Sequence, residues 1–127
     1  MKYTIFLFGE AERGAFCTPL LLKSLPELAE TFGNPPEESL GIMYGVQALL
    51  YEKELIYYRV KEEGFSVSDY MKGLRALENK DLTVAAVCLP GVGDSEIIDA
   101  TAHICNKRKS FLISTEKDLY DFLTNGF

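Results

Sequence analysis

The stretch that decides the fold runs from Thr83 to Glu96 and reads TVAAVCLPGVGDSE. Its first half, Thr83–Leu89, is an almost unbroken apolar run, which is typical of a strand covered on both faces. Gly91 and Gly93 then allow a tight turn, and Asp94 precedes apolar residues at helical spacing. A buried strand that turns directly into a capped helix is the building unit of a parallel α/β sheet.

Three further segments have strand character, and they are Thr4–Phe8, Leu55–Val60 and Ser110–Ile113. The first and last are nearly continuous apolar runs, so together with Thr83–Leu89 they are predicted to be central strands. The segment Leu55–Val60 contains two tyrosines and an arginine, which favours a position nearer an edge of the sheet.

Helical patterns separate these strands. One helix is expected to open at Thr18-Pro19 and to stop at Gly33, and a second runs from Pro36 to about Glu52. Further helices are expected to begin at Ser66, Asp94 and Thr115. In the second helix Gly41 and Gly45 share one face, which indicates close packing against a neighbour.

The alternation of strands and helices predicts the fold class. We expect one α/β domain over residues 1–127, a three-layer α/β/α sandwich of Rossmann-like or flavodoxin-like type with a mainly parallel sheet of about four to five strands. The region from 9 to 54 places two helices between the first two strands, and a short fifth strand would fit there.

Composition limits the partners. The 127 residues include 13 Lys and Arg against 19 Asp and Glu, a net charge of -6, and 47% are hydrophobic, as in soluble globular proteins. The only compact basic run is 107–109, so no nucleic-acid partner is expected. The apolar run before Glu10 is too short for a signal peptide or a membrane span. Three widely spaced cysteines are expected to be free thiols, which favours a cytoplasmic location.

The loops that follow the strands are the first place to look for a site. In open parallel sheets ligands bind beyond the carboxyl ends of the strands. We expect a small anionic, phosphate-bearing ligand there, because Arg13 suits phosphate binding and the glycine turn exposes helix N-terminal N–H groups. The candidate ligand-binding residues are Gly9, Glu10, Arg13, Gly91, Gly93, Asp94, Ser95 and Thr115.

Other roles than ligand binding stay open for these residues. The two glycines could serve only the turn, with Asp94 or Ser95 capping the helix. Arg13 could form an exposed ion pair with a carboxylate of its own loop. Glu10, Asp94 and Glu116 could instead surround a divalent cation, although no metal site is predicted.

The sequence identifies no catalytic group. His103 is the only histidine and falls on the polar side of its helix, so it is expected to be solvated. Cys17 would lie at or just before a helix N-terminus, yet an inert or packing thiol is the favoured interpretation. Enzymatic activity and the cofactor therefore stay open.

Two short segments resemble known families. Pro90–Glu96 resembles the Pro-Gly-Gly-x-Gly-Thr-x-x-Glu segment of the lysine-decarboxylase-like phosphoribohydrolases, which bind a nucleotide on a Rossmann-like sheet. It is one residue shorter, has one glycine fewer and has Asp94 in place of Thr. Val46–Val60 is similar to the first helix–strand unit of the small sulfur-relay proteins, whose thiol position has no counterpart here. No family is assigned.

The alternative function is a non-catalytic interaction or regulatory module, with a homodimer as one form of it. Seven tyrosines and eight phenylalanines are a large aromatic content for one small core. The segment Met43–Tyr58 is the expected surface, with Tyr44, Tyr57 and Tyr58 beside an edge strand.

Overall fold

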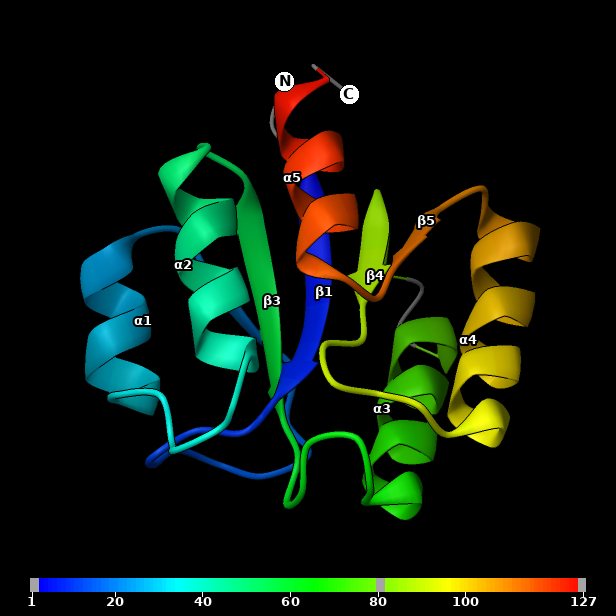
Figure 1. Cartoon of the computed structure of the whole chain (residues 1–127), viewed down its shortest axis with the longest axis horizontal. Coiled ribbons are helices and arrows are strands. Elements are labelled where there is room, and N and C mark those ends of the chain that lie inside the picture. The colour runs from blue at the N-terminus through cyan, green and yellow to red at the C-terminus, as the bar shows by residue number, and fades with distance from the viewer. Residues whose placement is uncertain (1–2, 80–81, 126–127) are drawn as a thin grey trace.

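The computed structural model describes residues 3–79 and 82–125 (Figure 1). Within these ranges no helix combines the length and the apolar character needed to span a bilayer. The elements, in chain order, are β1 (Thr4–Gly9), β2 (Leu20–Leu22), α1 (Leu25–Phe32), α2 (Gly41–Leu50), β3 (Glu54–Arg59), α3 (Val67–Asn79), β4 (Ala86–Cys88), α4 (Ser95–Arg108), β5 (Phe111–Ile113) and α5 (Glu116–Thr124).

The strands form one sheet in the order β2-β3-β1-β4-β5. β1 lies at the centre and runs parallel to both neighbours, with Thr4 opposite Glu54 on one side and Ile5 opposite Ala86 on the other. β5 is parallel to β4, and only β2 is antiparallel to its neighbour. The predicted α/β class with a mainly parallel sheet is therefore confirmed.

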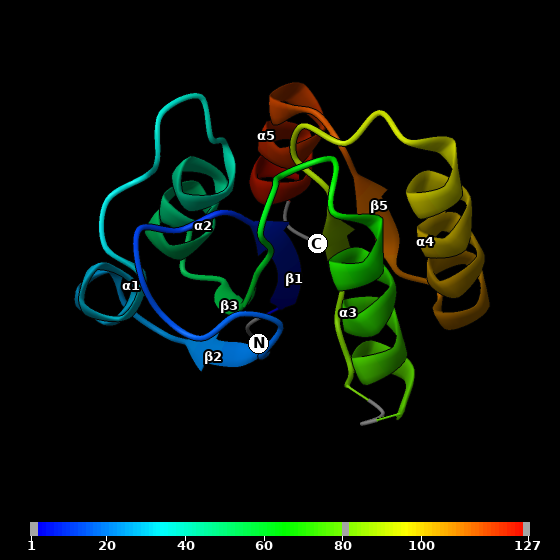
Figure 2. The same ribbon diagram turned by 90° about the horizontal axis from the view of Figure 1, so that it is seen from below.

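Helices cover both faces of the sheet (Figure 2). Ile5 and Leu7 of β1 point into a core formed with α1, α2 and α5, while Phe6 and Phe8 point into a second core with α3 and α4. Because both faces of β1 are buried from Ile5 onward, these positions favour apolar residues, and this explains the continuous run in the sequence.

Two predictions of strand position are wrong. β3 is an inner strand, because β2 pairs along its outer side, whereas β5 lies at the edge of the sheet. Both tyrosines of β3 are fully buried. The Tyr57 hydroxyl donates a hydrogen bond to the Glu10 carbonyl at 2.6 Å, and the Tyr58 hydroxyl donates to the Asp69 carbonyl at 2.8 Å. Their polar groups are therefore satisfied inside the protein, and tyrosine is no sign of an edge here.

The prediction of a helix from Thr18-Pro19 is also wrong, because the chain first forms β2, the short fifth strand. The helix α1 begins later, where Ser24 accepts a hydrogen bond from the Glu27 N–H at 3.3 Å. The Glu27 carboxylate accepts in return from the Lys23 N–H at 3.2 Å, close to a capping box. The second helix is shorter than expected, since α2 begins at Gly41 rather than at Pro36.

The two glycines of α2 have the predicted packing role. A Cβ on Gly41 would lie 2.7 Å from the Cα of Gly9 and would also meet the Tyr57 hydroxyl. A Cβ on Gly45 would lie 3.1 Å from a methyl group of Leu55. The helix backbone therefore approaches β1 and β3 more closely than any other residue would allow.

Candidate functional site

The loops after β1, β3, β4 and β5 lie at the carboxyl end of the sheet, which faces the viewer in Figure 2. Glu63, whose side chain is buried, joins the loops after β1 and β3 to the start of α2. Its Oε1 accepts hydrogen bonds from the Glu10 N–H at 3.0 Å, the Ser39 hydroxyl at 3.0 Å and the Gly41 N–H at 3.1 Å. Its Oε2 accepts from the Leu40 N–H at 2.7 Å.

Glu63 therefore supplies the hydrogen-bond acceptors for the free N–H groups at the N-terminus of α2. Leu40, at the N-cap of this helix, offers no side-chain acceptor for the free N–H groups. A helix start at this edge of the sheet is where an anionic ligand would be favoured, but the protein's own carboxylate occupies that position. Sequence analysis missed Glu63, since its partners Ser39, Leu40 and Gly41 lie 22 to 24 positions away along the chain.

The N–H groups at the start of α4 also have a protein acceptor, in this case the N-cap residue of the helix itself. Asp94 accepts hydrogen bonds from the N–H groups of Glu96 at 2.9 Å and Ile97 at 3.2 Å, so the capping alternative is the one that forms. Ser95 follows as an exposed first helical residue. At α5 the cap is Thr115, which accepts from the Asp118 N–H at 3.1 Å.

The two glycines of the β4–α4 loop have different surroundings. Gly91 has a φ of 75°, the left-handed region that favours glycine, and its carbonyl lies against Gly64 of the loop after β3. A Cβ on Gly91 would lie 3.6 Å from the Oε2 of Glu63. A Cβ on Gly93, by contrast, would meet nothing within 4 Å, so this glycine faces open space.

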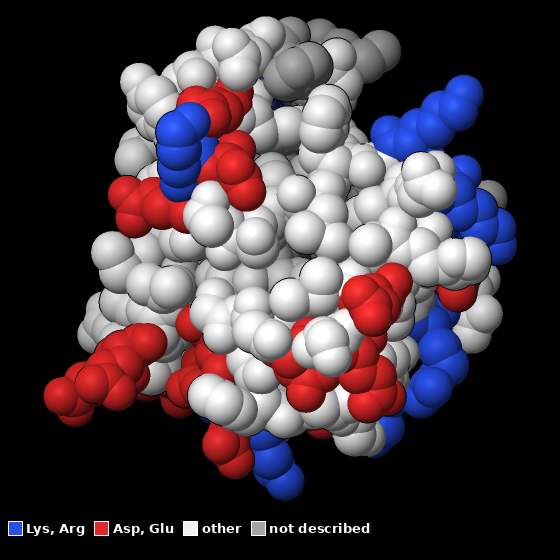
Figure 3. Space-filling view, turned by 45° about the vertical axis from the view of Figure 1, so that its right-hand side comes forward, with Lys and Arg blue, Asp and Glu red and all other residues white. Residues whose placement is uncertain are grey.

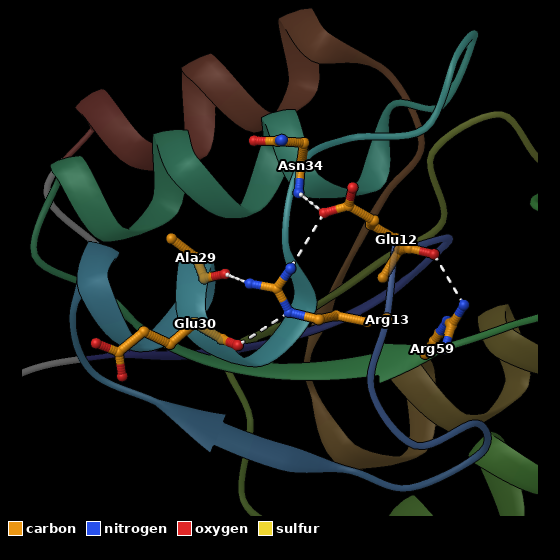
Figure 4. A network of polar contacts seen from close by, with 7 residues as sticks. Glu12, Arg13, Ala29, Glu30, Asn34 and Arg59 are labelled. Atoms are coloured by element: carbon orange, nitrogen blue, oxygen red, sulfur yellow. Dashed lines mark hydrogen bonds and ion pairs between the residues drawn. The ribbon is translucent and has the colours of Figure 1, made fainter.

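Arg13 contacts a different part of the protein (Figure 4). Its guanidinium donates to the carbonyls of Ala29 at 2.9 Å and Glu30 at 3.2 Å, near the C-terminal end of α1, where a cation is favoured. It also forms an exposed ion pair with Glu12 at 3.3 Å. None of these contacts is with the loop of Gly91 and Gly93, on which Arg13 was predicted to converge.

The carboxyl end of the sheet is acidic. The four loops, residues 9–17, 61–65, 90–95 and 114–116, contain six carboxylates and only two basic residues, and one of these is the Arg13 turned toward α1. On the face shown in Figure 3, acidic side chains gather in the lower part of the molecule, toward this end. Burial raises the pKa of Tyr44, and the nearby carboxylate of Glu116 raises it further. Binding of an anion here stays a prediction, without support from the local charge.

The alternative cation site is not formed either. Among residues 3–79 and 82–125, no three His, Cys, Asp or Glu side chains are placed to hold a metal ion, so Glu10, Asp94 and Glu116 do not make one.

The thiols and the histidine occupy ordinary positions. Burial raises the pKa of Cys105 to about 11, and it raises the pKa of the fully buried Cys88 further, so both stay protonated at neutral pH. Cys17 precedes β2 rather than a helix, and it packs against the second core. His103 is exposed on α4, as predicted.

Comparison of the chain with protein-family models, curated proteins and solved structures gives no match. A function is therefore inferred from the surface of the protein itself.

The predicted interaction surface does not contain the tyrosines that were expected to form it. Tyr44, Tyr57 and Tyr58 are all buried. The same segment is nevertheless exposed through other side chains, because Met43 is 48% exposed and Leu50 is 62% exposed. Both lie on the outer side of α2.

A hollow of about 540 Å³ runs between α2 and α5 next to these residues. Tyr51, just after α2, and Tyr120 on α5 are 44% and 55% exposed and border it. We call this surface the α2–α5 face, and it comprises Met43, Gln47, Leu50, Tyr51, Glu116, Lys117 and Tyr120.

The composition of α2 makes this exposure unusual. Its ten residues, GIMYGVQALL, include no charged side chain. A helix that is apolar on all sides is normally buried on all sides, because an outer face in water favours charged and polar residues. Here the sheet, α1 and α5 cover most of the helix, and Met43 and Leu50 remain exposed on its outer side, which is therefore suited to contact with another protein.

Proposed function

We propose that this protein is an interaction module that binds a protein partner through the α2–α5 face. The observation that carries the proposal is the uncharged helix α2 with an exposed outer side. Fully burying one large apolar side chain contributes about 1.5–3 kcal/mol. Four large side chains of the face are each about half exposed and can therefore supply several kcal/mol when a partner covers them; they are Met43, Leu50, Tyr51 and Tyr120. The carboxyl end of the sheet offers no comparable driving force, since the N-termini of α2, α4 and α5 already have protein acceptors there.

Site-specific photo-crosslinking in cells that naturally produce the protein tests the proposal. A photoreactive phenylalanine analogue replaces Tyr51 in one variant, Tyr120 in a second and Phe65 in a third. Phe65 is the matched control, because it is 77% exposed but lies after β3, at the carboxyl end. We expect the same crosslinked partner from positions 51 and 120 and none of it from position 65. Equal labelling at all three positions, or none at the first two, would contradict the proposal.

Light scattering of the purified protein adds the homodimer as a separate outcome. A dimer that dissociates when Leu50 is changed to Asp would make a second copy the partner on this face. A dimer that survives the change would place self-association elsewhere.

A further inference from the structure

The charge of the protein is distributed unevenly over its layers. Residues 25–53 and 114–125 build the layer of α1, α2 and α5, and they contain eight carboxylates against two lysines. This layer alone therefore accounts for the net charge of -6, and the remaining residues carry eleven acidic and eleven basic side chains. The exposed apolar surface of α2 therefore belongs to a layer whose own residues carry a net charge of -6.

This coincidence decides between two kinds of partner. A second copy bound face to face would bring two layers of charge -6 together, and like charges across an interface oppose association. A basic partner would be attracted instead, and its approach would be accelerated by the field of the layer. The charge therefore favours a positively charged partner over self-association.

The shape of the hollow indicates the form of that partner. Two helices, α2 and α5, form its walls, and Leu50, Tyr51 and Tyr120 supply apolar surface along it. Glu116 also lines it, whereas the ammonium of Lys117 is paired with Asp121 at 2.8 Å. An open hollow between two helices that is apolar along part of its lining can take the apolar side of a third helix.

Building on the proposed function, we propose that the α2–α5 face binds a basic amphipathic helix of another protein. Leucine-like side chains of that helix would enter the hollow beside Leu50 and Tyr120. Its Lys or Arg residues would lie beside Glu116 and the other carboxylates of the layer.

The probe is a fluorescein-labelled 18-residue helical peptide with Leu at positions i, i+3, i+4 and i+7 and Lys on the remaining surface. Two control peptides have Glu in place of every Lys, or the same composition in scrambled order. Anisotropy titrations use the full chain and three variants. The first variant, Leu50→Asn with Tyr120→Asn, keeps the charge and removes apolar surface. The second is Glu116→Gln, and the third is the control Phe65→Asn.

We expect the Lys peptide to bind at least about tenfold more tightly than either control peptide, and its affinity to fall as salt is raised. The Leu50/Tyr120 variant should lose about tenfold in affinity, Glu116→Gln should lose less, and Phe65→Asn should bind as the unchanged protein does. Equal binding to the Leu50/Tyr120 variant would overturn the inference, since the peptide would then respond to charge alone. A Glu peptide that binds as well as the Lys peptide would overturn it too.

The two proposals fail in different ways. If crosslinking at Tyr51 and Tyr120 captures a partner but the Lys peptide does not bind selectively, the face is an interaction surface for another class of partner. A dimer that dissociates on Leu50→Asp would likewise replace the basic helix by a second copy. If crosslinking at these positions captures nothing, the proposed function itself is wrong.

Discussion

The Glu63 carboxylate accepts a hydrogen bond from the Leu40 N–H at 2.7 Å, and this contact joins the loop after β3 to the first turn of α2. The same carboxylate holds Glu10 of the loop after β1. In return the Glu10 carboxylate accepts from the Glu63 N–H at 2.8 Å. One buried side chain therefore fixes the ends of two neighbouring parallel strands and the start of a helix.

Changing Glu63 to Gln tests this role. In the Gln side chain an NH2 group replaces one of the two carboxylate oxygens. A donor would then face at least one N–H group that now meets an acceptor, and the negative charge would be lost, so we expect the free energy of unfolding to fall by about 2 kcal/mol or more. Urea denaturation followed by circular dichroism measures the change. The matched control is Glu62→Gln at the exposed neighbouring position, which should stay within about 0.5 kcal/mol of the unchanged protein. Equal stability of the two variants would show that Glu63 is not needed for the fold.

The close approach of α2 to β1 makes a second prediction. Gly41→Ala would place a methyl group 2.7 Å from the Cα of Gly9, so we expect a loss of more than about 2 kcal/mol. Gly93→Ala adds the same methyl group in open space and should change stability by less than about 0.5 kcal/mol. Thermal and urea unfolding of the two variants give the comparison, and a stable Gly41→Ala protein would contradict the packing described for α2.

Adjacent leucines at the end of α2 provide a third test. Leu49 is buried against the first core, so Leu49→Ala should cost about 3 kcal/mol. Leu50 lies on the outer side, and Leu50→Ala should leave the stability within about 0.5 kcal/mol. Denaturation curves of the isolated protein measure both. A large loss for Leu50→Ala would mean that this residue serves the fold rather than a partner.

Alkaline pH should weaken the fold. Burial raises the pKa of Cys105 to about 11 from an ordinary 9.0, and it raises the pKa values of Cys88, Tyr57 and Tyr70 above their ordinary values. These groups ionise in the unfolded chain first, so between pH 9 and 11 the unfolded state binds fewer protons than the folded one. The free energy of unfolding should therefore fall, by up to about 1.4 kcal/mol per pH unit for each titrating group.

Urea denaturation at pH 7, 9 and 10 checks this fall. Cys88→Ala removes one of the buried thiols, and its stability should decline less steeply above pH 9 than that of the unchanged protein. A flat profile over this range for the unchanged protein would contradict the burial described for these side chains.

The sequence predicts the parts of the fold that depend on local patterns. The apolar run at Thr4–Phe8 and the caps at Asp94 and Thr115 depend on neighbouring residues, and each prediction agrees with the structure. The helix expected from Thr18 failed because Leu21, Leu22, Leu25 and Leu28 happen to follow helical spacing across a strand and a helix. The side chain of Ser24, with Glu27 three residues later, was the local signal for the true start of α1.

Other features depend on contacts that are distant in the sequence. Nothing near Leu55–Val60 shows that β2 will cover its outer side, so the strand could not be placed inside the sheet. The position of Arg13 is set by carbonyl groups 16 and 17 residues further along the chain. The candidate ligand site was therefore inferred from loops that do meet at one edge, but there α2, α4 and α5 already have protein acceptors at their N-termini.

The way α2 acquires its cap also bears on how the protein folds. A helix of ten residues with no capping side chain of its own is marginal in isolation. Its missing acceptor, Glu63, arrives only when the chain beyond β3 has docked beside β1. We expect substitutions at Glu63 and in the β1–β3 pair to slow folding to a similar extent, because helix and sheet then form in a single cooperative step whose rate is limited by closing the loop of more than fifty residues between Glu10 and Glu63.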